Sequence, residues 1–209
     1  MLAQSNPGQN LVYMNGQLVK ETDHSGIEGS PFFNDDWSTG LIMLADGRTF
    51  KDMILKYNIY TDEVYFKDQN GETKSFSNPV SEFKLLSTGN GSSNSKDFKS
   101  GYANIPGYTA KSFFEVLSEG AVQLLKKYRR VVSETTGIDL GTVTKNFTDK
   151  ESYYMIISGT ATLVKKDKKS ILALLNNKQI ELETYIKAHK LDLKNDDDLA
   201  KLINYYNSI

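Results

Sequence analysis

Few side chains in this chain of 209 residues have the types and spacing that acid–base chemistry requires. His24 precedes the acidic pair Asp35–Asp36, and Trp37 follows that pair directly. Paired carboxylates can divide the roles of general acid and general base, and an imidazole exchanges protons near neutral pH. A hydrolase-type site built from His24, Asp35 and Asp36 is therefore one hypothesis, although nothing in the spacing places the imidazole against the carboxylates.

Two acidic runs have the composition of metal sites, but each is better explained by a structural role. Asp196, Asp197 and Asp198 follow Asn195, a favoured N-cap residue, and acids in a first helical turn complement the positive end of the helix dipole. The run 68–72 lacks the alternating acids and the distant glutamate of a calcium loop, and it predicts a hairpin turn instead. The chain has no cysteine and only two histidines, so we expect no metal and no cofactor.

Basic residues are concentrated in two short clusters, 126–130 and 165–169. Either cluster could receive an anionic ligand such as phosphate or a lipid headgroup, with arginine as the bidentate group. We favour solvated strand ends, where lysines discourage edge-to-edge pairing. Lysine and arginine total 25 against 26 acids, so we expect no nucleic-acid partner. No apolar run approaches the roughly 18 residues of a transmembrane helix, and we expect no transmembrane segment.

Aromatic side chains are the other group with functional potential, because the chain has 12 tyrosines and a single tryptophan. Rings that project from a curved sheet can line a ligand cavity. The doublets 153–154 and 205–206 each predict one ring in the core and one at the rim. The candidate binding residues are Trp37, Tyr57, Tyr60, Tyr65, Tyr153 and Tyr154.

From Gly40 onward, short apolar runs alternate with turn residues at intervals typical of an antiparallel meander. Asp46–Gly47 and the segment 68–71 predict tight turns. A later hairpin turns at Gly120, and we interpret 121–132 as a strand rather than a helix. Another hairpin turns at Ser158–Gly159. We expect a polar loop over 133–146, and 87–101 has the composition of a linker.

The pattern becomes helical near Asp167, which can cap a short helix over residues 168–175. A second helix is predicted from about residue 178 to His189. The third begins near Asp196 and has an amphipathic stripe with helical spacing. That stripe consists of Leu199, Leu202, Ile203 and Tyr206.

These elements predict an α+β fold, with an antiparallel β meander that forms a curved sheet or half-barrel and three C-terminal helices packed on it. We divide the chain into an N-terminal arm or hairpin (1–28), an antiparallel β domain (29–165) and a C-terminal helical subdomain (166–209). Asn15–Gly16 favours a tight hairpin turn in the arm. The β domain has a mobile loop near 87–101, and the sequence leaves open whether this loop separates two domains.

Several runs combine turn residues with aromatic residues: Gly29-Ser30-Pro31-Phe32-Phe33, the stretch from Gly40 to Phe50, residues 55–64 and the ending 202–208. In these runs the chain resembles a group of exported bacterial envelope proteins without an assigned activity. The resemblance implies export and a β-rich fold, and it supplies no catalytic residue. The start at Ala3–Gln4 is typical of a chain from which a signal peptide was removed, so we expect a periplasmic or secreted location.

The scarcity of reactive side chains and the abundance of aromatic rings favour binding over catalysis. Our leading hypothesis is a non-enzymatic exported envelope protein that binds a partner or an apolar or amphiphilic ligand. The hydrolase-type site is one alternative. The other is a scaffold or interaction module that docks through an exposed stripe of Leu199, Leu202 and Tyr206 on its C-terminal helices.

Overall fold

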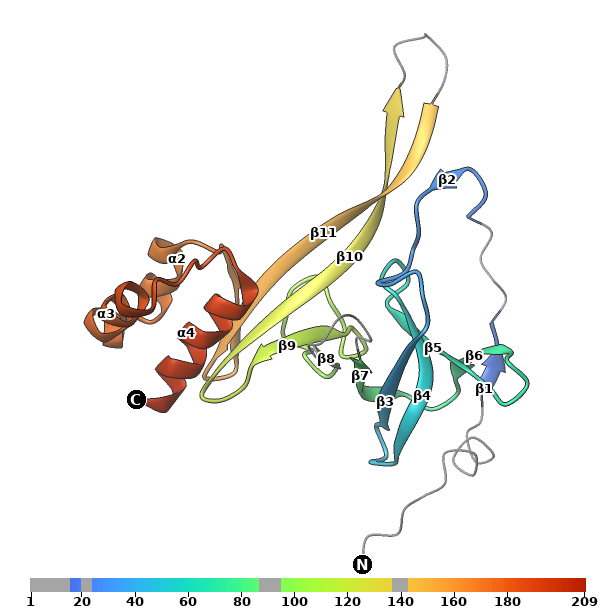
Figure 1. Ribbon diagram of the computed structural model, residues 1–209, viewed down its shortest axis with the longest axis horizontal. Helices are drawn as coiled ribbons and strands as arrows, with labels where there is room; N and C mark the ends of the chain where they lie inside the picture. The colour runs from blue at the N-terminus through green and yellow to red at the C-terminus, as the bar shows by residue number, and fades with distance from the viewer. Residues whose placement is uncertain (1–15, 20–23, 87–94, 137–142) are drawn as a thin grey trace, which may run out of the picture.

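The computed structural model describes residues 16–19, 24–86, 95–136 and 143–209, and these ranges form one curved, unclosed sheet with helices at its C-terminal end (Figure 1). Its strands lie in the order β1-β6-β5-β4-β3-β7-β8-β9-β10-β11-β12, and β2 pairs with β11 beside this path. The pair β2–β11 is parallel, whereas the other named pairs are antiparallel. The predicted α+β class with a curved meander is confirmed.

The first part of the sheet consists of hairpins whose turns follow the local turn chemistry. Gly47 adopts φ 86° in the turn between β3 and β4, as the Asp–Gly pair predicted. In the next turn, Asp68 accepts hydrogen bonds from the backbone of Asn70 and Glu72, so the 68–72 run is a hairpin turn. The strands are β1 (Gly16–Leu18), β2 (Ile27–Glu28), β3 (Ser38–Leu44), β4 (Thr49–Asn58), β5 (Glu63–Lys67), β6 (Thr73–Phe76), β7 (Val80–Leu86) and β8 (Ser95–Lys99).

Two predictions for this part need comment. Strand β8 occupies 95–99, where we expected linker, because its backbone pairs with β7 and its one core side chain, Phe98, is buried. Residues 87–94 lie outside the described residues. The predicted hairpin near 11–20 also lies mostly outside them, and β1 pairs with β6.

The second part of the sheet comprises β9 (Phe114–Ser118), β10 (Val122–Thr136), β11 (Val143–Ile157) and β12 (Thr160–Val164). The interpretation of 121–132 as a strand is confirmed, and so are the hairpins at Gly120 and Ser158–Gly159. The polar loop expected over 133–146 is wrong at both ends, because β10 extends to Thr136 and β11 begins at Val143, and residues 137–142 lie outside the described residues. Polar cross-strand pairs such as Ser133 with Thr148, whose hydroxyl oxygens lie 2.6 Å apart, stabilise this extension.

Three helices follow: α2 (Lys168–Leu174), α3 (Gln179–His189) and α4 (Asp196–Ser208), with a short 3-10 turn, η1 (Asn176–Lys178), between the first two. The predicted caps are confirmed. Asp167 accepts from the backbone N–H of Ser170 at 2.8 Å, and Asn195 accepts from the backbone of Asp197 and Asp198. Within the described ranges, no helix combines the length and the apolar character needed to cross a membrane.

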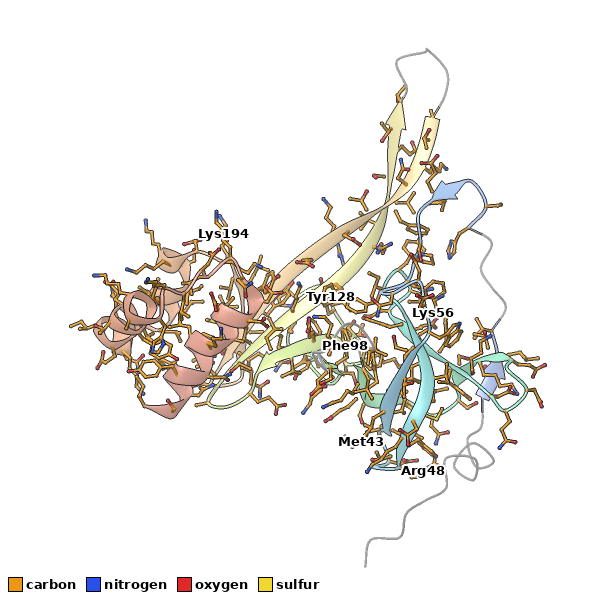
Figure 2. All side chains as sticks on the ribbon, in the orientation of Figure 1. Met43, Arg48, Lys56, Phe98, Tyr128 and Lys194 are labelled. Atoms are coloured by element: carbon orange, nitrogen blue, oxygen red, sulfur yellow. The ribbon has the colours of Figure 1, made fainter. Side chains whose placement is uncertain are left out.

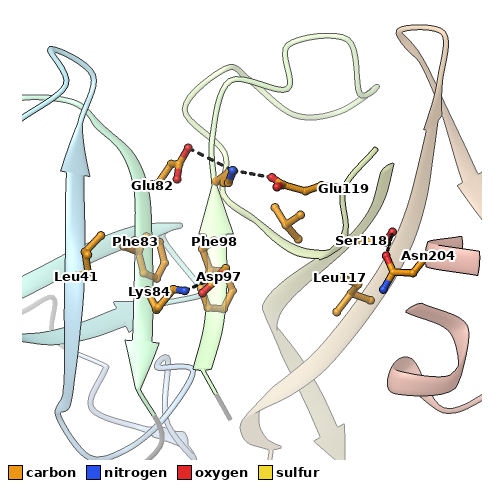
Figure 3. A pocket seen from close by; sticks show the side chains of 12 residues that line it. Leu41, Glu82, Phe83, Lys84, Asp97, Phe98, Leu117, Ser118, Glu119 and Asn204 are labelled. Atoms are coloured by element: carbon orange, nitrogen blue, oxygen red, sulfur yellow. Dashed lines mark hydrogen bonds and ion pairs between the residues drawn. The ribbon is translucent and has the colours of Figure 1, made fainter. Parts of the chain in front are cut away.

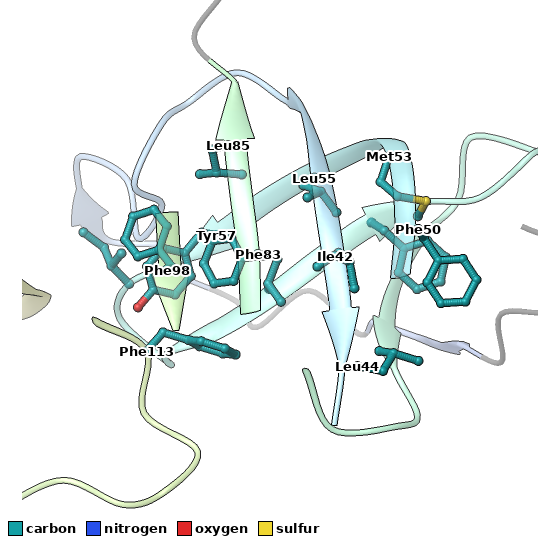
Figure 4. Packing of buried hydrophobic residues seen from close by; sticks show 13 residues of the cluster. Ile42, Leu44, Phe50, Met53, Leu55, Tyr57, Phe83, Leu85, Phe98 and Phe113 are labelled. Carbon is teal, nitrogen blue, oxygen red and sulfur yellow. The ribbon is translucent and has the colours of Figure 1, made fainter. Parts of the chain in front are cut away.

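The hydrophobic core divides into two large clusters and one small one. One large cluster lies within the N-terminal strands, where the rings of Phe83 and Phe98 stack with centroids 4.7 Å apart (Figure 4). The other joins the helices to the ends of β10, β11 and β12. Leu199 and Leu202 are fully buried there and Tyr206 is partly buried, so the two leucines do not form the exposed docking stripe expected on the C-terminal helices. The same side chains hold α4 on the sheet.

Candidate functional site

The larger of two candidate pockets lies between β7, β8, β9 and α4 and has a volume of about 580 Å³ (Figure 3). Its charged side chains neutralise one another. Lys84 pairs with Asp97 at 3.0 Å, and Lys99 pairs with Glu119 at 2.6 Å and with Glu82 at 3.4 Å. Because these groups already have partners, a ligand would have to displace an ion pair to gain a charged contact, which makes this pocket the weaker candidate.

A second pocket of about 260 Å³, which we call the Trp37 pocket, has a different chemistry. It contains the only tryptophan of the chain and three further aromatic or imidazole rings beside two lysines. The structure therefore brings together three of the side chains considered from sequence, His24, Trp37 and Tyr65. The pocket is lined by Val19, His24, Pro31, Phe32, Trp37, Lys56, Asn58, Tyr65, Lys67 and Thr73.

The loop before β3 forms one wall of the Trp37 pocket because its backbone pairs with the end of β4. Phe32 forms an antiparallel bridge with Asn58, and the N–H of Phe33 donates to the carbonyl of Tyr57 at 2.8 Å. Residues 32–33 therefore pair with the end of β4 much as a short strand would. This pairing fixes the positions of the Phe32 ring and of Trp37 farther along the loop, so the wall is preformed.

Two lysines from the neighbouring strands β4 and β5 lie over the aromatic rings; Lys56 is labelled in Figure 2. The Lys56 ammonium is 4.3 Å from the centroid of Phe32 and 5.8 Å from that of Trp37, and the Lys67 ammonium is 4.9 Å from Trp37. Lys56 donates to the main-chain carbonyl of Asp35, and Lys67 donates to that of Gly71 at 2.8 Å. Among the described residues, neither ammonium has a carboxylate at ion-pair distance.

The hydrolase-type arrangement does not form. The His24 ring packs edge-on against Tyr60 and Phe147, with centroids 5.7 and 5.4 Å apart. Asp35 and Asp36 are exposed, and neither lines the pocket that contains His24. Asp35 contributes only its main-chain carbonyl, because the carboxylates of this loop point toward solvent while its rings pack inward.

The remaining candidate binding residues do not share one site. Tyr57 is a core residue whose hydroxyl donates to Asp62 at 2.6 Å, and Tyr60 is 43% exposed. Tyr153 and Tyr154 are both buried, so the division of this doublet into core and rim is wrong. Both faces of β11 are covered here, since the helices pack on one face and the 101–112 loop packs on the other.

The second tyrosine doublet also departs from the expected division. Tyr205 and Tyr206 are both partly buried on α4. The Tyr205 ring stacks on Tyr185 of α3 with centroids 3.9 Å apart, and the hydroxyl of Tyr206 donates to Asn177 at 3.1 Å. Both rings therefore contribute to packing between the helices rather than to a ligand wall.

The basic cluster on β10 does not form a solvated strand end, because Lys126 and Lys127 are 6% and 2% exposed. Lys126 pairs with Asp196 at 2.7 Å and with Glu151 at 2.9 Å. Lys127 pairs with Asp62 at 2.6 Å. Burial lowers the pKa of Lys127, whereas for Lys126 the two carboxylates outweigh burial and raise the pKa.

Sequence reasoning missed this buried network because the acids that complete it come from distant segments. The preceding buried residues Leu124 and Leu125 were the one local signal that the strand continues into the interior. Asp62 reaches Lys127 from the turn after β4, and Asp196 reaches Lys126 from the first turn of α4. Both lysines join separate parts of the fold and are therefore structural residues first.

Comparison of the chain with protein-family models, with curated proteins and with solved structures finds no match. Among the described residues, no group of three or more histidine, aspartate or glutamate side chains is placed to hold a metal ion. The assignment of a site therefore depends on the geometry of the pockets themselves, and in the Trp37 pocket two lysines without a carboxylate partner among the described residues lie over aromatic rings.

Proposed function

We propose that this protein is a non-catalytic binding protein whose Trp37 pocket takes an anionic amphiphile. The ligand is a small molecule with a flat apolar part and one carboxylate, sulfate or phosphate group. One observation carries the proposal: the ammonium groups of Lys56 and Lys67 lie over the rings of Phe32 and Trp37 and have no carboxylate partner among the described residues.

The two parts of such a ligand match the two kinds of wall. Trp37 and Phe32 offer ring faces, and Pro31 adds apolar surface, so a flat apolar group would bury area on both sides. The lysines would then exchange their weak contacts with ring faces and main-chain carbonyls for charge-assisted hydrogen bonds. A volume of about 260 Å³ limits the ligand to one small ring system or a short chain.

The same geometry argues against catalysis in this pocket. His24 packs against aromatic rings, and the nearest acids of the loop, Asp35 and Asp36, are exposed. A general acid or base must lie within hydrogen-bond reach of the proton that it transfers to or from a bound substrate. Binding is therefore the function that these residues support best. Export to the cell envelope stays a prediction from the sequence.

The experiment uses Trp37 as the reporter, because it is the only tryptophan of the chain and lies in the pocket wall. Three probes of one shape isolate the role of charge: 2-naphthoate, 2-naphthylmethanol and 2-naphthylmethylammonium. Fluorescence titration and calorimetry of the full chain should rank their affinities as anion, then neutral compound, then cation. Equal affinity for all three would refute the electrostatic part of the proposal.

Matched variants locate the binding event. Lys56→Gln and Lys67→Gln should each lower the affinity for 2-naphthoate roughly fivefold, which corresponds to about 1 kcal/mol for a partly exposed charge. Lys51→Gln is the control, because Lys51 is exposed, lies on β4 like Lys56 and is outside the pocket. If Lys51→Gln lowers the affinity as much as the other two, the probe responds to net charge alone and the Trp37 pocket is not the site.

A further inference from the structure

The long hairpin of β10 and β11 treats its charges differently on its two faces. On one face, Arg130 lies directly opposite Asp149 and forms an ion pair with it. On the other face, Arg129 lies directly opposite Lys150. Side chains opposite each other in an antiparallel pair project from the same face of the sheet. Arg129 and Lys150 are therefore two adjacent cations, and we call this cross-strand pair the cationic rung.

This cationic rung is unfavourable without a counter-charge. Like charges directly opposite on a sheet destabilise the pairing. Arg129 and Lys150 are both exposed, and within the part of the chain that the structure describes neither forms an ion pair with a carboxylate. An anion bound between the two side chains would remove the repulsion and satisfy both groups.

Arg129 also lines a pocket of about 300 Å³, which we call the Arg129 pocket. At its inner end, Lys127 is 2% exposed and its ammonium pairs with Asp62 at 2.6 Å. Of the lining cations, Lys127 is paired with Asp62 and Arg130 with Asp149, so Arg129 is left without a carboxylate partner among the described residues. Lys150 projects from the same face of the hairpin, directly opposite Arg129. The pocket is lined by Ile59, Tyr60, Asp62, Gly107, Tyr108, Lys127, Arg129, Arg130 and Val131.

We propose that the Arg129 pocket binds a phosphoryl group, either as free phosphate or as a phosphomonoester of a small molecule. Arg129 supplies the planar fork that binds two phosphate oxygens at once, and Lys150 supplies a second positive charge from the opposite strand. Tyr60 and Tyr108 line the same pocket. Burial and a hydrogen bond with Tyr154 raise the pKa of Tyr108 to about 12, so its phenol adds no negative charge to the pocket.

The Lys127–Asp62 ion pair borders the proposed site and does not itself bind the phosphoryl group. The Lys127 ammonium forms an ion pair with Asp62 and donates a hydrogen bond to the carbonyl of Phe113 at 2.8 Å. The site is separate from the Trp37 pocket, and the proposal does not depend on the function proposed for that pocket.

The test is calorimetric titration of the full chain with inorganic phosphate, phenyl phosphate and sodium chloride at constant ionic strength. Saturable binding of a phosphate compound without a matching response to chloride supports the site. Tighter binding of phenyl phosphate identifies an esterified phosphoryl group, and equal or weaker binding identifies free phosphate. A response to chloride as large as the response to phosphate, or no saturable binding of either phosphate compound, overturns the proposal.

Variants place the binding at the cationic rung. Arg129→Gln should weaken phosphate binding about tenfold and Lys150→Gln about fivefold, because the first removes a bidentate contact and the second a single one. Lys145→Gln, which removes a positive charge paired with Glu134 on the same hairpin, should leave the affinity unchanged. In phosphate-free buffer, Arg129→Gln should raise the midpoint temperature of unfolding. Equal phosphate affinity in all three variants would overturn the assignment.

Discussion

The carboxylate of Asp196 provides the sharpest test of how the helices are held on the sheet. Its Oδ2 accepts from Lys126 at 2.7 Å, and its Oδ1 accepts from Lys166 and from the hydroxyl of Tyr153, both at 2.8 Å. Asp196→Asn keeps the shape of the side chain and removes its charge. We expect this substitution to destabilise the fold, because it removes an anionic partner from Lys126 in the interior.

The expected loss follows from the exposure of the two partners. Removing one partner of a buried ion pair costs about 3–5 kcal/mol. Asp196 is 25% exposed, and Lys126 keeps Glu151 at 2.9 Å, so part of the interaction is screened and part survives. We therefore expect a loss of about 2 kcal/mol in the free energy of unfolding, below the range for a fully buried pair.

Asp197→Asn is the matched control, because Asp197 is the next residue of the same first turn and is exposed. Both variants lose the interaction of a negative charge with the helix dipole, about 0.3–1 kcal/mol. Only Asp196→Asn also removes a negative charge that Lys126, Lys166 and Tyr153 contact. Urea unfolding at pH 7, followed by circular dichroism, measures both. If the two variants agree within about 0.5 kcal/mol, the reasoning is refuted.

The pH dependence gives an independent check. Burial alone would raise the pKa of Asp196, but hydrogen bonds from Lys126, Lys166 and Tyr153 outweigh it and hold the pKa below its ordinary value. A lowered folded-state pKa contributes stability above the unfolded value of about 3.9, and this contribution is lost as pH falls through the folded value. The difference between the native chain and Asp196→Asn should stay constant from about pH 7 to 5 and shrink below about pH 4.

Two further substitutions test close packing and a helix-to-strand contact. In Gly40→Ala, the new Cβ would lie 2.2 Å from the carbonyl oxygen of Lys84, so β3 and β7 must separate. We expect the free energy of unfolding, measured in urea, to fall by about 2–3 kcal/mol. An unchanged free energy of unfolding would contradict this. Asn207 accepts from the N–H of Val122 at 2.9 Å and donates to its carbonyl at 2.8 Å. Asn207→Ala should cost about 1–3 kcal/mol and speed amide exchange at Val122, and unchanged exchange there would argue against this role.

Local sequence signals predicted much of the fold. The hairpin turns at Asp46–Gly47 and Ser158–Gly159 and the caps Asp167 and Asn195 act within a few residues, so their chemistry is readable without a partner. Strand β8 and the outer half of the β10–β11 hairpin were missed. Their polar residues carry no alternating pattern, and only pairing with a neighbouring strand makes them extended.

The candidate site could be predicted only in part. An aromatic wall containing Trp37 and Tyr65 was anticipated from residue type, but the sequence did not indicate that Lys56 and Lys67 would lie over the same rings. Lys56 lies on β4, Lys67 on β5 and Trp37 in the loop before β3, so the three side chains come from separate segments of the chain. Which side chains share a pocket therefore depended on the register between strands.

By itself, the sequence determined the class of this protein: an antiparallel sheet followed by three helices, two of them with predicted caps, and few reactive side chains. Only the tertiary structure decided how its charges are used. Lys126 and Lys127 are adjacent in the chain, yet their side chains are buried on opposite sides of the sheet because successive residues of a strand project from opposite faces. The acids that neutralise them, Asp196 and Asp62, are brought by distant segments. Long-range contacts thus turned a basic run that resembled a solvated surface into two buried ion pairs beside an unneutralised cationic rung.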